Sequence, residues 1–270
     1  MKKIIALLLA LTLVLSLAAC SGKKEEKGVK IGILQFAPHA SLDNCYNGIM
    51  KALNEKGYVD GQNGCTIEFI NGQGEGETNQ LAAQNFVNKG FDIIIAIATP
   101  SAMPCYAAAK EAGIPVIFSA VSDPLGAGLV QSLENPQTGA TGTSDSLNYT
   151  AQLELIRAFQ PEAKNIGILY TTSEANSLAQ LKKYQELAGN YGFEIKAQGI
   201  TDASEVASGI ASLIASGIDC VCNLTDNNVV NNFSVVTAAT DPAGIPCYGS
   251  EEEQVSSWRR GRSRWWCCPC

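Results

Sequence analysis

Polar side chains gather where apolar, strand-like segments end, and their chemistry suits the binding of a small polar molecule. Thr99 and Ser101 follow one such segment. With Ser101 as a helix N-cap, the first helical turn would offer hydroxyls and backbone N–H groups to a carboxylate or carbonyl. Asp226 lies nine residues beyond Gly217, as Thr99 lies nine residues beyond Gly90, and an acid there could pair with a ligand ammonium. Both segments could equally be ordinary helix caps without a ligand.

The segment after Tyr170 carries more polar side chains than a helix cap requires, so we expect it to contact the ligand as well. Phe36 follows the first predicted strand and could stack on a ring, or be a core residue at the edge of a cleft. The full set of predicted ligand-binding residues is Gln35, Phe36, Thr99, Ser101, Ala102, Asp123, Ser173, Glu174, Asn176, Ser177, Asp226 and Asn227.

Motifs for catalysis are largely missing from the chain. The sequence GTSDS at residues 142–146 lacks the last glycine of the G-x-S-x-G nucleophile elbow, and the one histidine, His39, has no context for a catalytic triad. The sequence GQGEGE at residues 72–77 fails the dinucleotide pattern G-x-G-x-x-G and carries acids that would repel phosphate. We therefore expect recognition without chemistry, with no cofactor and no metal site. A hydrolase using Ser144 or Ser173 is a minor alternative.

Short apolar segments alternate with amphipathic segments from residue 29 onward, which is typical of βαβ units with parallel sheets. The pattern predicts strands over residues 29–35, 66–71, 93–98 and 115–120, and helices over residues 42–56, 78–89 and 102–112. Open parallel sheets bind ligands outside the carboxyl ends of their strands, which is where the polar residues named above stand.

The same sequence pattern occurs twice. IGIL at residues 31–34 recurs at 166–169, GFD at 90–92 corresponds to GID at 217–219, and GIP at 113–115 recurs at 244–246. Three matches in the same order predict an α/β fold with two similar parallel-sheet lobes. The lobes would cover residues 29–144 and 145–255, with the boundary in a segment rich in Gly, Ser, Thr and Asn.

Composition supports a globular protein that does not bind nucleic acid. The chain has 270 residues, of which 46% are hydrophobic and 17% charged, enough for a hydrophobic core. Its net charge of -7 lacks the clustered Lys and Arg on which binding to a phosphate backbone depends. Six cysteines in the lobes (Cys45, Cys65, Cys105, Cys220, Cys222 and Cys247) show no regular disulfide spacing, and their pairing stays open.

Both ends of the sequence differ from the lobes. Residues 1–20 have two lysines, a short apolar run and small residues before Cys20, as a secretory signal has. Residues 21–28 are charged and read as a flexible tether. Residues 256–270 hold all three tryptophans and four of the five arginines without helical or strand periodicity, so we interpret them as an aberrant tail from a shifted or misassembled reading frame.

Several of these segments together resemble one known family. They are IGILQF with HASLD, ATPSA, SDPLGAGLV, TGTSD, IGILYTTSEANS and IPCYGSEEEQV, all within residues 29–255. In these segments the chain resembles the substrate-binding lipoproteins of ABC transporters, in particular the group that includes tryptophan- and tyrosine-type binding proteins. LAAC at residues 17–20 resembles a lipobox, in which the cysteine, here Cys20, is lipidated.

The resemblance implies a type I periplasmic-binding-protein fold whose lobes close on a small ligand, favoured here as a hydrophobic or aromatic amino acid. It also implies export, a lipid anchor on the extracytoplasmic face of the bacterial membrane, and delivery to an ABC permease with its ATPase. Relatives continue beyond a segment like EEEQV, so the second lobe is expected to be incomplete. A sensory subunit that presents the ligand to a membrane receptor is the alternative.

Overall fold

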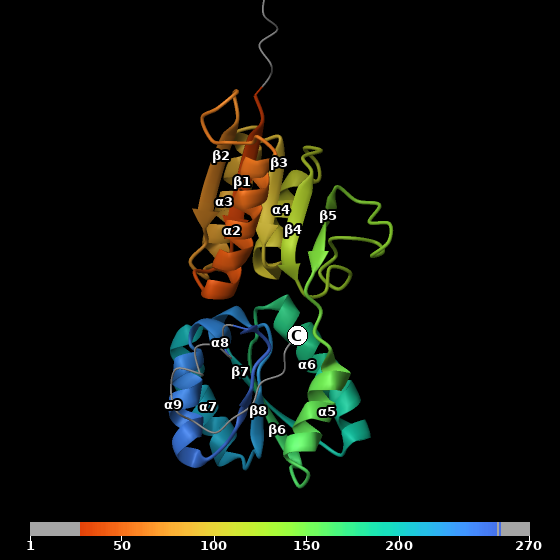
Figure 1. The fold of residues 1–270 in the computed structure, drawn as a ribbon, viewed down its shortest axis with the longest axis vertical. Coiled ribbons are helices and arrows are strands. Elements are labelled where there is room, and N and C mark those ends of the chain that lie inside the picture. Colours follow the sequence, from red (N-terminus) through yellow and green to blue (C-terminus); the bar gives the residue numbers. More distant parts are fainter. Residues whose placement is uncertain (1–27, 253, 255–270) are drawn as a thin grey trace, which may run out of the picture.

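Two parallel sheets, each made from its own half of the chain, form two stacked lobes in the computed structural model, which describes residues 28–252 and 254 (Figure 1). The first sheet has the order β2-β1-β3-β4-β5. Its strands are β1 (Lys30–Gln35), β2 (Thr66–Asn71), β3 (Ile93–Ile97), β4 (Val116–Val121) and β5 (Ala140–Ser144). The runs of Ile, Val and Phe in β1, β3 and β4 suit strands that helices cover on both faces.

Helices cover both faces of this sheet. On one face, α3 (Gly76–Asn88) and α4 (Thr99–Ala109) pack against β1, β3 and β4 around Phe86, Ile94 and Val116. On the other face, α2 (Ala40–Glu55) packs through Leu42 against Ile33 and its neighbours. The two separate apolar clusters explain why β1 and β3 are buried along most of their length.

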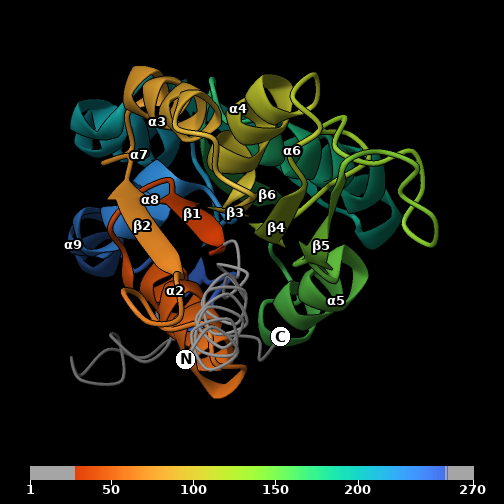
Figure 2. The same ribbon diagram turned by 90° about the horizontal axis from the view of Figure 1, so that it is seen from above.

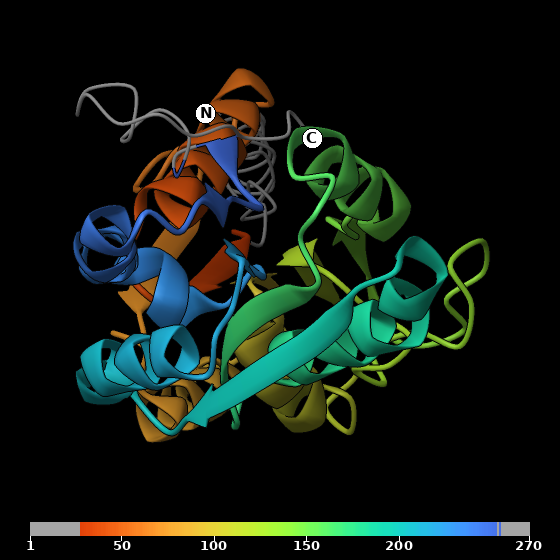
Figure 3. The same cartoon turned by 90° about the horizontal axis from the view of Figure 1, so that it is seen from below.

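The second lobe repeats this plan with the order β7-β6-β8-β9. Its strands are β6 (Asn165–Thr171), β7 (Glu194–Ile200), β8 (Cys220–Cys222) and β9 (Cys247–Tyr248). Its helical segments are α5 (Tyr149–Phe159), α6 (Ala175–Leu187), η1 (Ala188–Tyr191), η2 (Ala203–Glu205), α7 (Val206–Ala215), α8 (Asn227–Asn231) and α9 (Phe233–Ala243). Helices α5 and α6 cover one face, and α7 and α9 the other, as the view from below shows (Figure 3).

The repeated motifs have the same structural role in both lobes. Asp92 accepts a hydrogen bond from the backbone N–H of Lys30 at 2.9 Å, and Asp219 accepts from those of Lys164 and Asn165 at 2.7 and 2.8 Å. Each Asp thereby fixes the start of the first strand of its lobe. Gly113 and Gly244 both end a helical segment with a positive φ, at 66° and 68°. The prediction of two similar lobes is confirmed.

The chain passes between the lobes over residues 145–148, after β5 and before α5 (Figure 1). Seen from above, the first lobe lies over the second, so that the carboxyl ends of the upper strands face the lower lobe (Figure 2). Hydrogen bonds join the lobes from Ser122 to Thr225 at 3.0 Å and from His39 to Asn227 at 3.2 Å. The lobes therefore touch along the edge where the strands of both sheets end.

Some predictions fall outside the described residues. These are the signal segment 1–20 with Cys20, the tether up to residue 27, and the tail 256–270. Within the described ranges, no helix combines the length and the apolar character that a membrane crossing requires.

Candidate functional site

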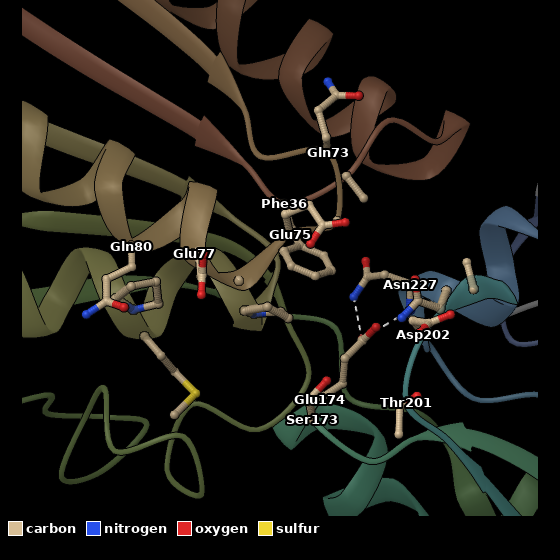
Figure 4. Close-up of a pocket in the computed structure, with 18 of the residues that line it drawn as sticks. Phe36, Gln73, Glu75, Glu77, Gln80, Ser173, Glu174, Thr201, Asp202 and Asn227 are labelled. Atoms are coloured by element: carbon tan, nitrogen blue, oxygen red, sulfur yellow. Dashed lines mark hydrogen bonds between the residues drawn. The ribbon is translucent and has the colours of Figure 1, made fainter. Parts of the chain in front are cut away.

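A cleft of about 1020 Å³ lies between the two lobes and is lined by both (Figure 4). The first lobe supplies Phe36, the start of α3 and one side of α4. The second lobe supplies the segments that follow β6, β7 and β8. Because all these segments come after strands, the cleft lies at the edge where the sequence predicted ligand binding. Its volume is at the upper end of the range usual for small-molecule sites.

The charged groups that line the cleft are all acidic. They are Glu75, Glu77, Glu174 and Asp202, and the lining of this part of the molecule contains no lysine, arginine or histidine. Met103, Pro100 and Pro104 on α4 add an apolar wall. The cleft is thus suited to a molecule that brings a positive group and an apolar body.

Glu174 is the buried acid of this set. Its side chain is 2% exposed, and its Oε2 accepts hydrogen bonds from Asn176 Nδ2, from the backbone N–H of Asn227 and from Asn227 Nδ2, at 3.1, 3.1 and 2.6 Å. Its Oε1 has no hydrogen-bond partner. Burial, together with the nearby Asp226 carboxylate, raises the pKa of Glu174 to about 8. Phe36 and Glu174, from opposite lobes, point into the same space (Figure 4).

Asp226 has a different place from the one we predicted. It is fully buried and does not line the cleft. Its two oxygens accept hydrogen bonds from Thr171 N and Oγ1 at 2.6 and 2.8 Å, from Ser177 Oγ at 2.7 Å, and from Val229 N at 3.0 Å, the last as the N-cap of α8. Since donors of its own lobe satisfy both oxygens, Asp226 holds the loops after β6 and β8 together, and Glu174 takes the position from which a carboxylate can meet a ligand.

The prediction that Ser101 caps α4 is wrong. The helix begins at Thr99, with Ala98 as the N-cap at a positive φ of 79°. Pro100 fits the first turn, where no N–H is needed, so the helix starts earlier than the serine suggested. Ser101 Oγ donates to Asn79 Oδ1 at 2.7 Å within the first lobe, and Ala102 belongs to the core of that lobe. Neither residue lines the cleft.

The other predicted residues of the first lobe divide into two groups. Phe36 lines the cleft, whereas Asp123 lies in a turn and accepts a hydrogen bond from Gly126 N at 2.8 Å. Gln35 Nε2 donates to Ala37 O and Asp43 Oδ1, at 2.8 and 2.7 Å. Gln35 Oε1 and Thr99 Oγ1 are buried without a partner.

In the second lobe, Ser173 and Asn227 line the cleft together with Glu174. Asn176 and Ser177 lie behind them, where they bind Glu174 and Asp226. Asn176 Oδ1 and both polar atoms of the Asn223 amide are buried without a partner. Buried polar groups almost always have partners, because leaving one unpaired costs about 1–3 kcal/mol. Glu174 Oε1 is such an unpaired atom on a residue that lines the cleft, whereas Asn176 and Asn223 do not line it.

Sequence reasoning missed several residues of the cleft. Thr201, Asp202 and Ala203 line it from the end of β7, and Glu75 and Glu77 line it from the start of α3. The two acids of the GQGEGE segment lie between the end of β2 and the first turn of α3. That position was the available signal.

Comparison with known proteins agrees with this geometry. Residues 30–258 match the family model described as ABC transporter substrate binding protein. The chain belongs to this family. The predicted family and the predicted type I periplasmic-binding-protein fold are confirmed. Such substrate-binding proteins are extracytoplasmic and pass a small ligand to their transporter.

Individual relatives cover most of the chain. A tyrosine-binding protein of Clostridioides difficile (strain R20291) is 41% identical over 269 residues, which is 95% of this chain and 77% of the relative. A domain from Streptococcus pneumonia in complex with L-Trp has 34% identity and a TM-score of 0.79, over 85% of this chain and 76% of that one. The ligand-free, open structure of a Clostridium difficile substrate-binding protein with adhesive properties has 40% identity, a TM-score of 0.57, and coverage of 82% and 75%.

The two structural relatives differ in how well they superpose. The structure resembles the L-Trp complex more closely than the open, ligand-free protein, although the latter has the higher sequence identity. In this structure the lobes are in contact through the hydrogen bonds from Ser122 to Thr225 and from His39 to Asn227.

Proposed function

We propose that this ABC-transporter substrate-binding protein captures an aromatic or other hydrophobic amino acid between its lobes. The observation that carries the proposal is the Glu174 carboxyl group, which is buried in the cleft and has one oxygen without a partner. A ligand ammonium would supply that partner, and a charge-assisted hydrogen bond in a buried site is among the stronger polar contacts.

The rest of the lining suits the other parts of such a ligand. Phe36 and Met103 offer apolar and aromatic surface to a ring. The Ser173 hydroxyl, on the wall of the cleft, is the candidate donor to the ligand carboxylate. The names of two relatives, a tyrosine-binding protein and an L-Trp complex, support the same ligand class.

Binding without chemistry is part of the proposal. His39, the one histidine of the chain, is hydrogen-bonded to Asn227 Oδ1. Ser144 Oγ donates to the carbonyl oxygen of Ser122 at 3.3 Å, and Ser173 stands on the wall of the cleft. Within the described part of the chain, neither hydroxyl is hydrogen-bonded to a side chain that could act as its base.

A lipid anchor at Cys20 and delivery to an ABC permease with its ATPase complete the proposal. They are supported by the lipobox-like LAAC and by membership of the family. Labelled fatty acid should be incorporated into the wild type and not into Cys20→Ala. No observation on the cleft favours the alternative of a sensory subunit.

Isothermal titration calorimetry with L-tyrosine and L-tryptophan tests the ligand class. We expect binding of both amino acids, and loss of binding for 3-(4-hydroxyphenyl)propanoate, which lacks the ammonium group. Glu174→Gln should weaken binding of L-tyrosine by about 10- to 100-fold, because a hydrogen bond to a charged group is lost. Asn47→Ala, at an exposed position of α2 outside the lining of the cleft, is the matched control. Equal binding of the propanoate and L-tyrosine would refute the assignment of Glu174.

A further inference from the structure

Asn227 connects the two lobes through a single side-chain amide. On its own lobe, its Nδ2 donates to Glu174 Oε2 at 2.6 Å, and its backbone N–H donates to the same oxygen at 3.1 Å. On the other lobe, its Oδ1 lies 3.2 Å from His39 Nε2. We propose that Asn227 is a positioning residue that couples closure of the lobes to the placement of the Glu174 carboxyl group. This inference rests on the proposed role of Glu174 in ligand binding.

The chemistry of the three groups fixes the direction of each hydrogen bond. Oε2 already accepts from the Asn227 backbone N–H, and with a ligand ammonium bound the carboxylate is ionised and only accepts, so the amide turns its NH₂ group toward Glu174 and its oxygen toward His39. The His39 ring must then carry a proton on Nε2, which holds for one neutral tautomer and for the charged ring alike. An amide bound at both ends in this way cannot flip without losing both contacts.

His39 is placed for this contact by the first lobe. It precedes α2, in the N-cap position, but its side chain makes no capping hydrogen bond. Its ring is 8% exposed and reaches across to Asn227, which is 5% exposed. When the lobes separate, this contact breaks, and Asn227 keeps only its bonds within the second lobe.

The second side-chain donor to Glu174 is linked to the other lobe in a similar way. Asn176 Nδ2 donates to Glu174 Oε2 and, at 2.8 Å, to the carbonyl oxygen of Thr225. The Thr225 hydroxyl meets Ser122 of the first lobe at 3.0 Å. Both side chains that hold Oε2 are thus bound to segments that contact the first lobe, whereas Oε1 is left for the ligand.

Stopped-flow kinetics with L-tyrosine on the full chain tests the coupling. His39→Leu removes the donor from the first lobe, and we expect dissociation to be about tenfold faster with little change in association, because the hydrogen bond forms only after closure. His39→Gln, which can donate from its amide, should restore slow dissociation in part. Asn47→Ala, at an exposed position of α2 outside the lining of the cleft, should behave as the wild type.

A double-mutant cycle separates coupling from simple loss of contacts. His39→Leu should speed dissociation of L-tyrosine in the wild-type background. It should have almost no effect in the Asn227→Ala background, because the hydrogen-bond partner of His39 is then already missing. Additive effects on the dissociation rate would refute the coupling. If the wild type binds neither L-tyrosine nor L-tryptophan, the proposed function fails instead; if it binds them and the cycle is additive, only the role of Asn227 fails.

Discussion

At the scale of residues, the site depends on two neighbouring carboxyl groups in different surroundings. Asp226 is buried but accepts four hydrogen bonds, whereas Glu174 accepts all its hydrogen bonds on one oxygen. Burial and the charge of Asp226 raise the pKa of Glu174 to about 8, so the Glu174 carboxyl is largely protonated at neutral pH without a ligand.

Ligand binding should therefore release a proton from Glu174. A ligand ammonium favours the ionised carboxylate, so binding lowers the pKa and the affinity rises with pH up to about 8, by at most about tenfold per unit. Calorimetry of L-tyrosine binding at pH 7, in two buffers of different ionisation enthalpy, measures the released protons. We expect nearly one proton for the wild type and none for Glu174→Gln. Equal proton release by both proteins would contradict the assignment.

The sequence predicted which segments form this site better than it predicted the role of each residue in it. Ser173, Glu174 and Asn227 were predicted because they follow strands, and the structure brings them to one cleft. The roles of Asp226 and Glu174 could not be told apart, because position along the chain does not reveal which carboxylate has donors of its own lobe nearby.

At the scale of elements, the glycine of each IGIL motif lets a side chain of its own lobe lie against the first strand. A Cβ atom on Gly32 would lie 2.8 Å from the Phe86 ring of α3, and one on Gly167 would lie 2.6 Å from Ile218. Both distances are too short for real contacts, so packing requires a residue without a side chain at both positions.

Gly32→Ala should accordingly lower the free energy of unfolding by about 1–3 kcal/mol, through overpacking against Phe86. Gly48→Ala is the matched control, because Gly48 lies within α2 and a Cβ there meets nothing within 4 Å. That control should raise stability by about 0.5–1 kcal/mol, since alanine favours helix. Urea denaturation followed by circular dichroism measures both, and equal effects would contradict the packing argument.

The predicted elements agree closely with the structure where apolar periodicity decides them, as in β2 over Thr66–Asn71. The start of α4 differs, because Ala98 precedes it with a positive φ and without a side-chain capping hydrogen bond. A positive φ at alanine leaves no sequence signal, since only glycine and asparagine commonly indicate it.

At the scale of the whole molecule, two lobes with the same strand order face each other through the carboxyl ends of their strands. Residues from both lobes meet a ligand only when the lobes are together, so ligand shifts the equilibrium toward the closed state. The internal repeats predicted the two lobes. The placement of one lobe relative to the other could not be predicted, because it depends on contacts such as Ser122 with Thr225, which are far apart in sequence.

Small-angle X-ray scattering should detect this closure. Saturating L-tyrosine is expected to lower the radius of gyration of the wild type and of Asn47→Ala, and to leave that of Glu174→Gln unchanged at the same ligand concentration. If calorimetry shows that the wild type is saturated with L-tyrosine and its radius of gyration is nevertheless unchanged, the lobes do not move on binding.

The acidic lining of the cleft also decides which solutes reach Glu174 at all. Glu75, Glu77 and Asp202 line the cleft without a positive side chain among the lining residues. Dianions such as phosphorylated metabolites are therefore repelled on approach, whereas neutral zwitterions are not.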